Sequence, residues 1–367
     1  MQFIDLRAQY QAYREAIDAA IREVVESAQF INGPQVKSLE QALAAYVGTE
    51  QAVGFSSGTD SLRAVLMAWG IGPGDEVVTT PFTFIATSEV IVAQGAKPVF
   101  VDVEEDTLNI DPARIEAAIT PRTRAILPVS LFGQCADLHA INAIAARHGL
   151  HVMEDACQSL GATSHGQYSG SLCQAGATSF FPAKTLGCYG DGGMVFTSDA
   201  ALAEKLRIIR EHGQAARYRH AMVGINGRLD TLQAAILLAK LPHFEAEIAS
   251  RQEVAQRYMA GLAGKVRLPN IRPYNRSVFS QFTIRVPNRD QVAERLKQAG
   301  IPTAVHYPVP LHRQPVFTDL EQDLGYGEEA FPVASQAARE VLSLPMHPFL
   351  TAAQQEEVVQ AVVAAVS

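Results

Sequence analysis

Between about residues 50 and 200, short apolar segments alternate with segments of helical spacing. AVGFSSG (52–58), DEVVTTP (75–81) and KPVFVDV (97–103) are apolar along much of their length. Each is followed by a segment with apolar residues three or four positions apart, such as TDSLRAVLMAWG (59–70). Strands that are apolar on both faces belong to a sheet that helices cover on both sides. We therefore predict an α/β fold built on a mostly parallel sheet.

The pattern changes after residue 200. Long helical segments follow, among them LDTLQAAILLAKL (229–241). QFTIRV (281–286) and TAVHYPV (303–309) are predicted strands, and 332–344 and 351–367 are predicted helices. A chain of 367 residues exceeds what one small core requires. We predict a large domain over residues 1–240 with N-terminal helices, and a smaller C-terminal α/β domain over residues 241–367.

Charge and composition exclude several classes of partner. The formal net charge of −8 argues against binding to nucleic acid or to an anionic membrane, which needs a basic face. The N-terminus is interrupted by charges, unlike a signal peptide, and no run approaches the ~20 apolar residues of a membrane span. We expect a cytoplasmic protein.

The cysteines do not suggest a metal or redox site. They lack a C-x-x-C pair, and no ligand set with metal spacing is visible, so we predict free thiols and no bound metal. Cys188, near Lys184, is interpreted as a small buried residue in preference to a reactive one. The four cysteines are Cys135, Cys157, Cys173 and Cys188.

Two polar motifs lie where parallel strands are predicted to end, which is where α/β sheets bind ligands. In SSGTDSL, Gly58 permits close backbone approach, Thr59 is a candidate helix N-cap, and free N–H groups there suit a phosphate. A capped helix without a ligand explains this motif equally well. In HVMEDACQS, Glu154 and Asp155 close a strand. A carboxylate there could pair with a lysine, bind a metal or hold a protonated ring nitrogen, and taken alone a structural role is favoured.

The segment SFFPAKTLGCYGDGG (179–193) places one lysine, Lys184, among four glycines. Glycines leave room for a planar ring beside the lysine. A lysine that forms a Schiff base must be neutral part of the time, which burial and nearby cations favour. A single loop lysine is more often a solvated charge.

Taken together, the three motifs match the needs of pyridoxal 5'-phosphate (PLP). This cofactor needs an anchor for its phosphate, an anion beside its pyridine nitrogen and a lysine for its aldehyde.

Several segments of the sequence resemble those of a known family. SSGTDSL, TTPFTFIATSEVI, VMEDACQSLGA, SFFPAKTLGCYGDGG and GINGRLDTLQAA are similar to signature segments of the DegT-type sugar aminotransferases. These are fold-type I PLP-dependent transferases that act on nucleotide-linked keto-sugars, and the resemblance covers essentially the whole chain. PVSLFGQCAD, TAVHYPVPLHRQP and LSLPMHPFL resemble a subgroup that aminates UDP-2-acetamido-2-deoxy-3-oxo-glucuronate in O-antigen and related polysaccharide pathways.

The resemblance implies roles for particular residues. Lys184 would form the Schiff base with PLP and carry the proton between substrate and cofactor, while Asp155 would pair with the pyridine nitrogen. Gln158 would bond to the cofactor's 3-hydroxyl and Phe82 would lie on the ring face. The phosphate would be held by Ser57, Gly58, Thr59 and Ser179.

Two further implications concern partners. Asn226 would reach the phosphate from a second subunit, so the active sites would be shared in a homodimer. The expected substrates are a nucleotide-linked keto-sugar and an amino donor, which we expect to be glutamate. Each residue also has a plainer interpretation: Phe82 as core, Gln158 and Ser179 as polar caps, and Asn226 with Gly227 as a turn.

The substrate contacts follow less directly from the motifs. Arg228 belongs to an arginine-rich segment that could meet an anionic substrate, and His306 and Tyr307 are candidates for contact with the sugar. Many relatives carry Tyr where this chain has Gly227, which leaves local substrate contacts open. A solvated helix end and a core histidine are the plainer interpretations. The other arginines of the segment are Arg207, Arg210, Arg217 and Arg219.

Three rival functions remain at this stage. A keto-sugar dehydratase of the same fold carries His at the position of the Schiff-base lysine, so Lys184 argues against it. A regulatory protein that retains the cofactor without turnover conflicts with the complete set of motifs. An aminotransferase for another 3-keto sugar or a 4-keto-6-deoxy sugar is the serious alternative.

Overall fold

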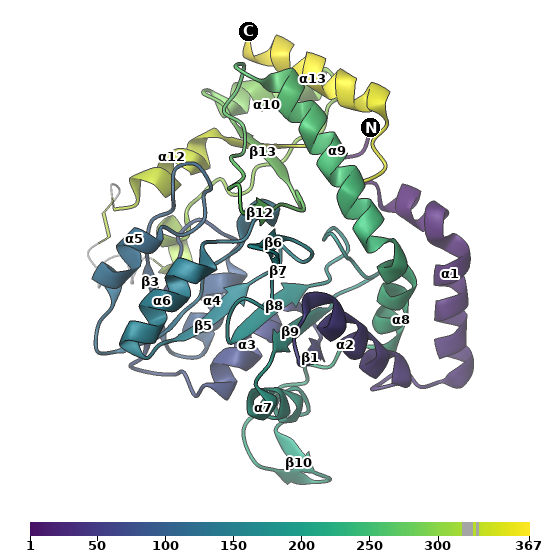
Figure 1. Cartoon of the computed structure of the whole chain (residues 1–367), viewed down its shortest axis with the longest axis vertical. Helices are drawn as coiled ribbons and strands as arrows, with labels where there is room; N and C mark the ends of the chain where they lie inside the picture. The colour runs from purple at the N-terminus through teal and green to yellow at the C-terminus, as the bar shows by residue number, and fades with distance from the viewer. Residues whose placement is uncertain (318–325, 328–329) are drawn as a thin grey trace.

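A seven-stranded sheet forms the centre of the computed structural model, which describes residues 1–317, 326–327 and 330–367 (Figure 1). Strand β9 is antiparallel to both of its neighbours, β1 and β8, and all the other neighbouring strands of this sheet pair in parallel. The predicted, mostly parallel sheet is confirmed. In spatial order the strands are β1 (Gln51–Phe55), β9 (Gly193–Thr197), β8 (Ala175–Ser179), β5 (His151–Asp155), β4 (Thr123–Ile126), β2 (Glu76–Thr79) and β3 (Lys97–Phe100).

Helices cover both faces of this sheet because alternate residues of each strand are apolar on opposite sides. In β9, Val195 packs in the cluster that contains α3, α4 and α7, whereas Met194 packs in the cluster that contains α2 and α8. The helices of this part are α1 (Leu6–Ser27), α2 (Pro34–Val47), α3 (Gly58–Ala68), α4 (Ala86–Ala93), α5 (Pro112–Ile115), α6 (Leu138–His148), α7 (Ala200–Arg210) and α8 (Thr231–Lys240). Within the described ranges, none of the helices is long and apolar enough to cross a membrane.

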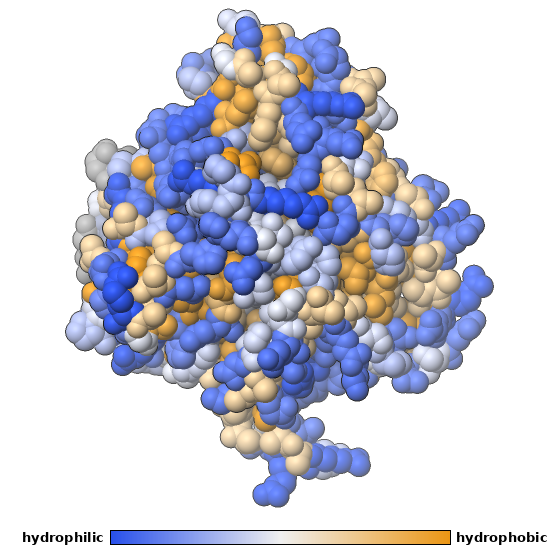
Figure 2. Space-filling model, viewed as in Figure 1, coloured by the Kyte–Doolittle hydropathy of each residue, from blue (hydrophilic) through white to orange (hydrophobic). Residues whose placement is uncertain are grey.

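Several short strands and turns accompany the central sheet and its helices. The strands β6 (Thr163–Ser164), β7 (Gln167–Tyr168) and β12 (Asn275–Arg276) form a three-stranded sheet. The hairpin of β10 (Gln214–Ala216) and β11 (Arg219–His220) projects from the body, with hydrophilic residues at its tip (Figures 1 and 2). Single 3-10 turns are η1 (Glu116–Ala118), η2 (Leu131–Gly133), η3 (Leu241–His243), η4 (Leu311–Arg313) and η5 (Pro315–Phe317).

The C-terminal part has a hydrophobic cluster of its own. Helix α9 (Phe244–Leu262) leads from the main body to the end of the molecule where α10 and α13 lie (Figure 1). Tyr258 of α9 packs there with Phe282 and Leu342. The domain boundary at residues 240 and 241 stays a prediction. The other elements are β13 (Phe282–Arg285), α10 (Arg289–Gln298), α12 (Pro332–Glu340), β14 (Val341–Leu344) and α13 (Ala352–Val366).

Two sequence predictions are wrong in this part. The predicted helix 332–344 ends at Glu340, and Val341–Leu344 forms β14 because it pairs antiparallel with β13. The predicted strand 303–309 is absent, and only Ala304 bridges to Ser343. Pro302 and Pro308 lack the N–H that a ladder needs, which explains why this apolar segment does not pair along its length.

The buried histidines His312 and His347 predict a loss of stability in acid. Burial and the charge of Arg313 lower the pKa of His312 to about 4, and burial and Arg251 lower that of His347 to about 4. The usual value is 6.5, so between pH 6.5 and 4 the unfolded chain binds more protons than the folded chain. The free energy of unfolding should therefore fall as the pH decreases through this window, by roughly 2–3 kcal/mol for each ring.

Urea unfolding at pH 7.5 and pH 4.5 measures this loss. His312→Leu and His347→Leu should each reduce the difference between the two pH values. An equally large difference in the variant with both changes would show that other groups cause the acid sensitivity.

Candidate active site

The predicted site residues gather at one edge of the central sheet. Strands β1, β2, β4, β5 and β8 run in the same direction, so their carboxyl ends meet at that edge. The segments that leave these ends carry Ser57, Gly58, Phe82, Asp155, Gln158, Ser179 and Lys184.

The first turn of α3 lies against the end of β8. Ser57 is the N-cap of α3, and its Oγ accepts a hydrogen bond from the N–H of Asp60 at 3.0 Å. The prediction that Thr59 caps α3 is wrong, because Thr59 lies inside the helix. An N-cap residue directly precedes the first helical residue, and this position is occupied by Ser57. A Cβ at Gly58 would approach the Ser179 Cβ to 2.7 Å, so only glycine fits here without displacement. The helix N-terminus and the Ser179 hydroxyl together suit an anionic group.

Asp155 lies at the base of the site and is almost fully buried. Its Oδ2 accepts from the Thr87 hydroxyl at 2.8 Å, and its Oδ1 accepts from the N–H of Cys157 at 3.2 Å. Two donors from different segments fix the orientation of the carboxylate, as a group that faces a ring nitrogen requires. Sequence reasoning did not assign Thr87 a role, although it lies in one of the motifs that carry the family resemblance.

The adjacent Glu154 has a structural role. It points to the other face of β5, where it accepts from the hydroxyls of Ser130 at 2.5 Å and Ser169 at 2.7 Å and from the N–H of Gly170 at 2.7 Å. Burial raises its pKa, while these three donors lower it. The structure thus separates the two carboxylates that the sequence placed side by side.

Gln158 and Tyr307 connect the main body to the C-terminal part. The Gln158 Oε1 accepts from the N–H of Phe132 at 3.0 Å, and its Nε2 lies 3.1 Å from the Tyr307 hydroxyl. Phe82 is fully buried and stands edge-on to the rings of Phe132 and Tyr307, at centroid distances of 6.5 and 6.4 Å. Burial and the charge of Asp155 raise the pKa of Tyr307, so its phenol stays protonated. The stacking role of Phe82 stays a prediction.

Lys184 is half-buried on the turn that follows β8. Burial lowers the pKa of His306, and the positive charge of Lys184 lowers it further. Burial raises the pKa of Cys157 well above the usual value, and the charge of Lys184 partly offsets this increase. The charge of Lys184 therefore influences both side chains. The His306 Nδ1 is 3.0 Å from the Ser343 Oγ, which leaves Nε2 as the nitrogen available to a ligand. Cys157 is a site residue that sequence reasoning did not identify.

Cys188 agrees with its predicted role as a small buried residue. Its Sγ lies 3.0 Å from the carbonyl oxygen of Phe180, and burial raises its pKa to about 11. A thiol with that pKa is not a nucleophile at neutral pH.

Asn226 and Arg228 lie at the rim of the site. The N–H of Ser56 donates to the carbonyl oxygen of Gly227 at 2.8 Å, which places this segment beside the start of α3. The Arg228 Nη1 forms an ion pair of 2.9 Å with the Glu211 Oε2, and Asn226 is exposed to solvent. The segment that carries both residues thus lies beside the Ser57 turn of its own chain, and the predicted roles of Asn226 and Arg228 stay untested.

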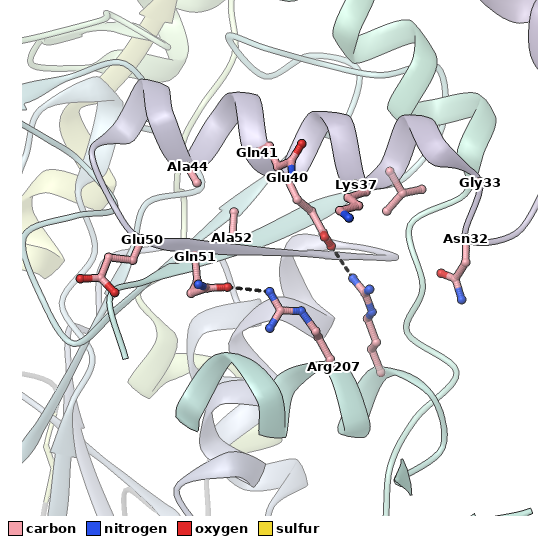
Figure 3. Close-up of a pocket in the computed structure, with 12 residues that line it drawn as sticks. Asn32, Gly33, Lys37, Glu40, Gln41, Ala44, Glu50, Gln51, Ala52 and Arg207 are labelled. Carbon is pink, nitrogen blue, oxygen red and sulfur yellow. Dashed lines mark hydrogen bonds and ion pairs between the residues drawn. The ribbon is translucent and has the colours of Figure 1, made fainter. Parts of the chain in front are cut away.

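A groove of about 520 Å³ lies apart from these residues, between α2, β1 and α7 (Figure 3). Two of its arginines bond to side chains of the same groove: Arg210 pairs with Glu40 at 2.6 Å, and Arg207 donates to the Gln51 Oε1 at 2.8 Å. These two arginines support the packing of α7, so the structure assigns them no substrate contact.

Comparison with known proteins identifies the family. The family model described as DegT/DnrJ/EryC1/StrS aminotransferase matches residues 11–363. The chain belongs to the DegT/DnrJ/EryC1/StrS aminotransferase family. Among its curated relatives is the UDP-2-acetamido-2-deoxy-3-oxo-D-glucuronate aminotransferase of Pseudomonas aeruginosa PAO1, which is 52% identical over 354 residues, 96% of this chain and 97% of the relative.

Solved DegT/DnrJ/EryC1/StrS structures share the fold over the whole chain. The crystal structure of S. venezuelae DesV in complex with a ketimine intermediate has a TM-score of 0.96 and 42% identity, covering 100% of this chain and 98% of that chain. The structure of NtdA from Bacillus subtilis with bound cofactor PMP has a TM-score of 0.90 and 32% identity, and the match covers 99% of this chain and 83% of that chain. The predicted family, fold type, PLP dependence and aminotransferase activity on nucleotide-linked sugars are confirmed.

Proposed function

We propose that this enzyme transfers an amino group from glutamate to the ketone of UDP-2-acetamido-2-deoxy-3-oxo-glucuronate. The 52% identity to the relative that carries this substrate in its name supports the choice of sugar. The observation that carries the chemistry is the meeting of Lys184, Asp155 and the N-terminus of α3 at one sheet edge. We further propose that the reaction takes place in the cytoplasm and supplies an amino sugar to O-antigen or a related polysaccharide.

The residues at the sheet edge fit PLP. The first turn of α3, with Ser57, Gly58 and Thr59, would hold the phosphate together with Ser179. Asp155 would keep the ring nitrogen protonated, and Lys184 would bind the aldehyde carbon through Nζ. When bound, PLP accepts the electrons that are released as a substrate C–H bond breaks.

Lys184 is the residue that moves the proton. Its Nζ would take a proton from the donor carbon in the first half of the reaction and deliver one to the sugar carbon in the second half. Tyr307 stays protonated and His306 stays neutral, since burial and Lys184 lower the pKa of this imidazole. Neither group competes with Lys184 as a charged acid. We propose that His306 donates from Nε2 to the sugar and that Tyr307 orients Gln158 toward the 3-hydroxyl of the cofactor.

We propose a homodimer with shared active sites. Phe84 and Phe181 are 55% and 52% exposed, although Phe84 lies beside Tyr307 with ring centroids 6.2 Å apart and Phe181 directly precedes the turn that carries Lys184. Large apolar side chains exposed at an active site are typical of a surface that a second subunit covers. Asn226 and Arg228 of the second copy would then complete the contacts to the phosphate and to the anionic substrate.

A two-step spectroscopic experiment tests the proposal. Glutamate added to the purified holoenzyme should abolish the absorbance band of the lysine-bound cofactor. The 3-oxo-glucuronate nucleotide should then restore the band, and a 4-keto-6-deoxy sugar nucleotide should not. Restoration by the 4-keto sugar would contradict the proposed substrate and favour the alternative aminotransferase. No response to any amino donor would contradict transamination and favour a dehydratase or a regulatory protein.

A further inference from the structure

Lys240 is a buried cation that the proposed mechanism does not use. It is the last residue of α8 and is only 2% exposed. Its Nζ donates to the carbonyl oxygen of Gly187 at 2.7 Å and lies 4.2 Å from the centroid of the Tyr189 ring. A lysine is almost never buried to this extent without a partner that requires it. Both of its partners belong to the loop that begins at Lys184.

That loop is folded back tightly on the end of β8. The N–H of Lys184 donates to the carbonyl oxygen of Phe181 at 2.8 Å, and the N–H of Cys188 donates to that of Phe180 at 2.8 Å. A Cβ at Gly187 would lie 2.4 Å from the carbonyl oxygen of Pro182, so the two sides of the turn touch at this glycine. The Gly187 carbonyl is buried, and without Lys240 it would lose this donor.

A second side chain of α8 holds the same loop. Gln233 accepts from the N–H of Tyr189 at 2.8 Å and lies 3.4 Å from its carbonyl oxygen. Gln233 and Lys240 are seven positions apart, so they lie on one face of the helix. Burial lowers the pKa of Lys240 to about 8, and the nearby Glu247 and Cys188 favour its charged form. Two side chains of α8, those of Gln233 and Lys240, thus form hydrogen bonds with the loop, and the bond from Lys240 is charge-assisted.

We propose that Lys240 is a positioning residue, whose hydrogen bond to Gly187 holds the Lys184 turn where Nζ can reach the aldehyde of PLP. The inference rests on the proposed role of Lys184. In the step concerned, the neutral Nζ of Lys184 adds to the aldehyde carbon, and its two hydrogens leave with the aldehyde oxygen as water, so that a C=N bond replaces C=O. A displacement of about 1 Å at a reacting atom can cost up to about 100-fold in rate, which makes a rigid turn necessary.

Lys240→Met tests this inference because it keeps the apolar stem and removes the donor. Apoprotein is mixed with PLP, the C=N bond is trapped with borohydride at successive times, and the modified Lys184 peptide is counted by mass spectrometry. We expect the rate of bond formation to fall about tenfold in Lys240→Met. Lys240→Gln, a neutral side chain that can still donate, should recover most of the rate.

Arg251→Met is the matched control. Arg251 is a buried cation of α9 whose Nη1 donates to the carbonyl oxygen of Met346 at 3.2 Å. Among the residues that the structure describes, it forms no hydrogen bond or ion pair with the Lys184 loop. Its removal should lower Tm and leave the rate of bond formation at the wild-type value. An unchanged rate in both Lys240 variants, or equal slowing in Arg251→Met, would overturn the positioning role. Absence of a trapped Lys184 peptide in the wild-type protein would instead overturn the proposed function itself.

Discussion

Lys184→Ala is expected to lower kcat by at least about 10⁴-fold, because one side chain supplies both the covalent link and the proton transfer. The variant should lose the absorbance band of lysine-bound PLP. It should still bind PLP, since the start of α3, Ser179 and Asp155 are untouched. Equilibrium dialysis against PLP and single-turnover kinetics with glutamate measure the two effects separately.

Lys205→Ala provides the control for this experiment. Lys205 lies on α7 and is exposed to solvent, so its removal should leave both the band and kcat unchanged. If Lys184→Ala kept turnover within tenfold of the wild type, another group would have to be the base. His306, whose pKa is lowered by the charge of Lys184, would then be the first to test.

Asp155→Asn should produce the second large loss, roughly 10²–10³-fold in kcat, because an amide of the same size cannot supply a negative charge to the ring nitrogen. With the amide oxygen in the place of Oδ1, it would still accept from the N–H of Cys157, and the amide nitrogen could donate to the Thr87 hydroxyl oxygen, so the fold should change little. The ring nitrogen should then titrate at lower pH, which a pH series of the bound cofactor's spectrum will show.

Glu154→Gln separates this electrostatic effect from a loss of stability. Glu154 is buried next to Asp155 but bonds to Ser130, Ser169 and Gly170 on the other side of β5. The variant should lower Tm without moving the spectral titration. Equal spectral shifts in the two variants would mean that Asp155 acts through the fold of β5 and not through its charge.

The sequence allowed the central sheet and the chemical centre of the site to be predicted for the same reason. Largely apolar segments that alternate with helices, such as that of Val77 and Val78, indicate a parallel sheet covered on both faces, and polar residues that follow such strands meet at one edge. Lys184 and Asp155 were singled out because three motifs together match the needs of PLP; taken alone, each residue had a plainer interpretation.

The features that the sequence did not predict depend on contacts between segments that are distant in the chain. β14 became a strand because β13, more than 50 residues earlier, lies beside it. Thr87 and Lys240 look like ordinary helix residues in the sequence, and only the fold shows that they reach Asp155 and Gly187. The cap of α3 was misplaced by two residues, an error that hydrogen-bond geometry alone could correct.

The sheet order also bears on how the protein is made. β1 is an outer strand whose sheet partner is β9, about 140 residues later in the chain. At a synthesis rate of about 5–20 residues per second, the ribosome needs roughly 7–30 s to add that length. Throughout this interval β1 has no strand to pair with, and the turn at Ser57 that follows it is not yet fixed beside Ser179. Cofactor capture must therefore wait until more than half of the polypeptide has emerged, and the newly made first strand depends on its flanking helices, or on a chaperone, to avoid pairing with another nascent chain.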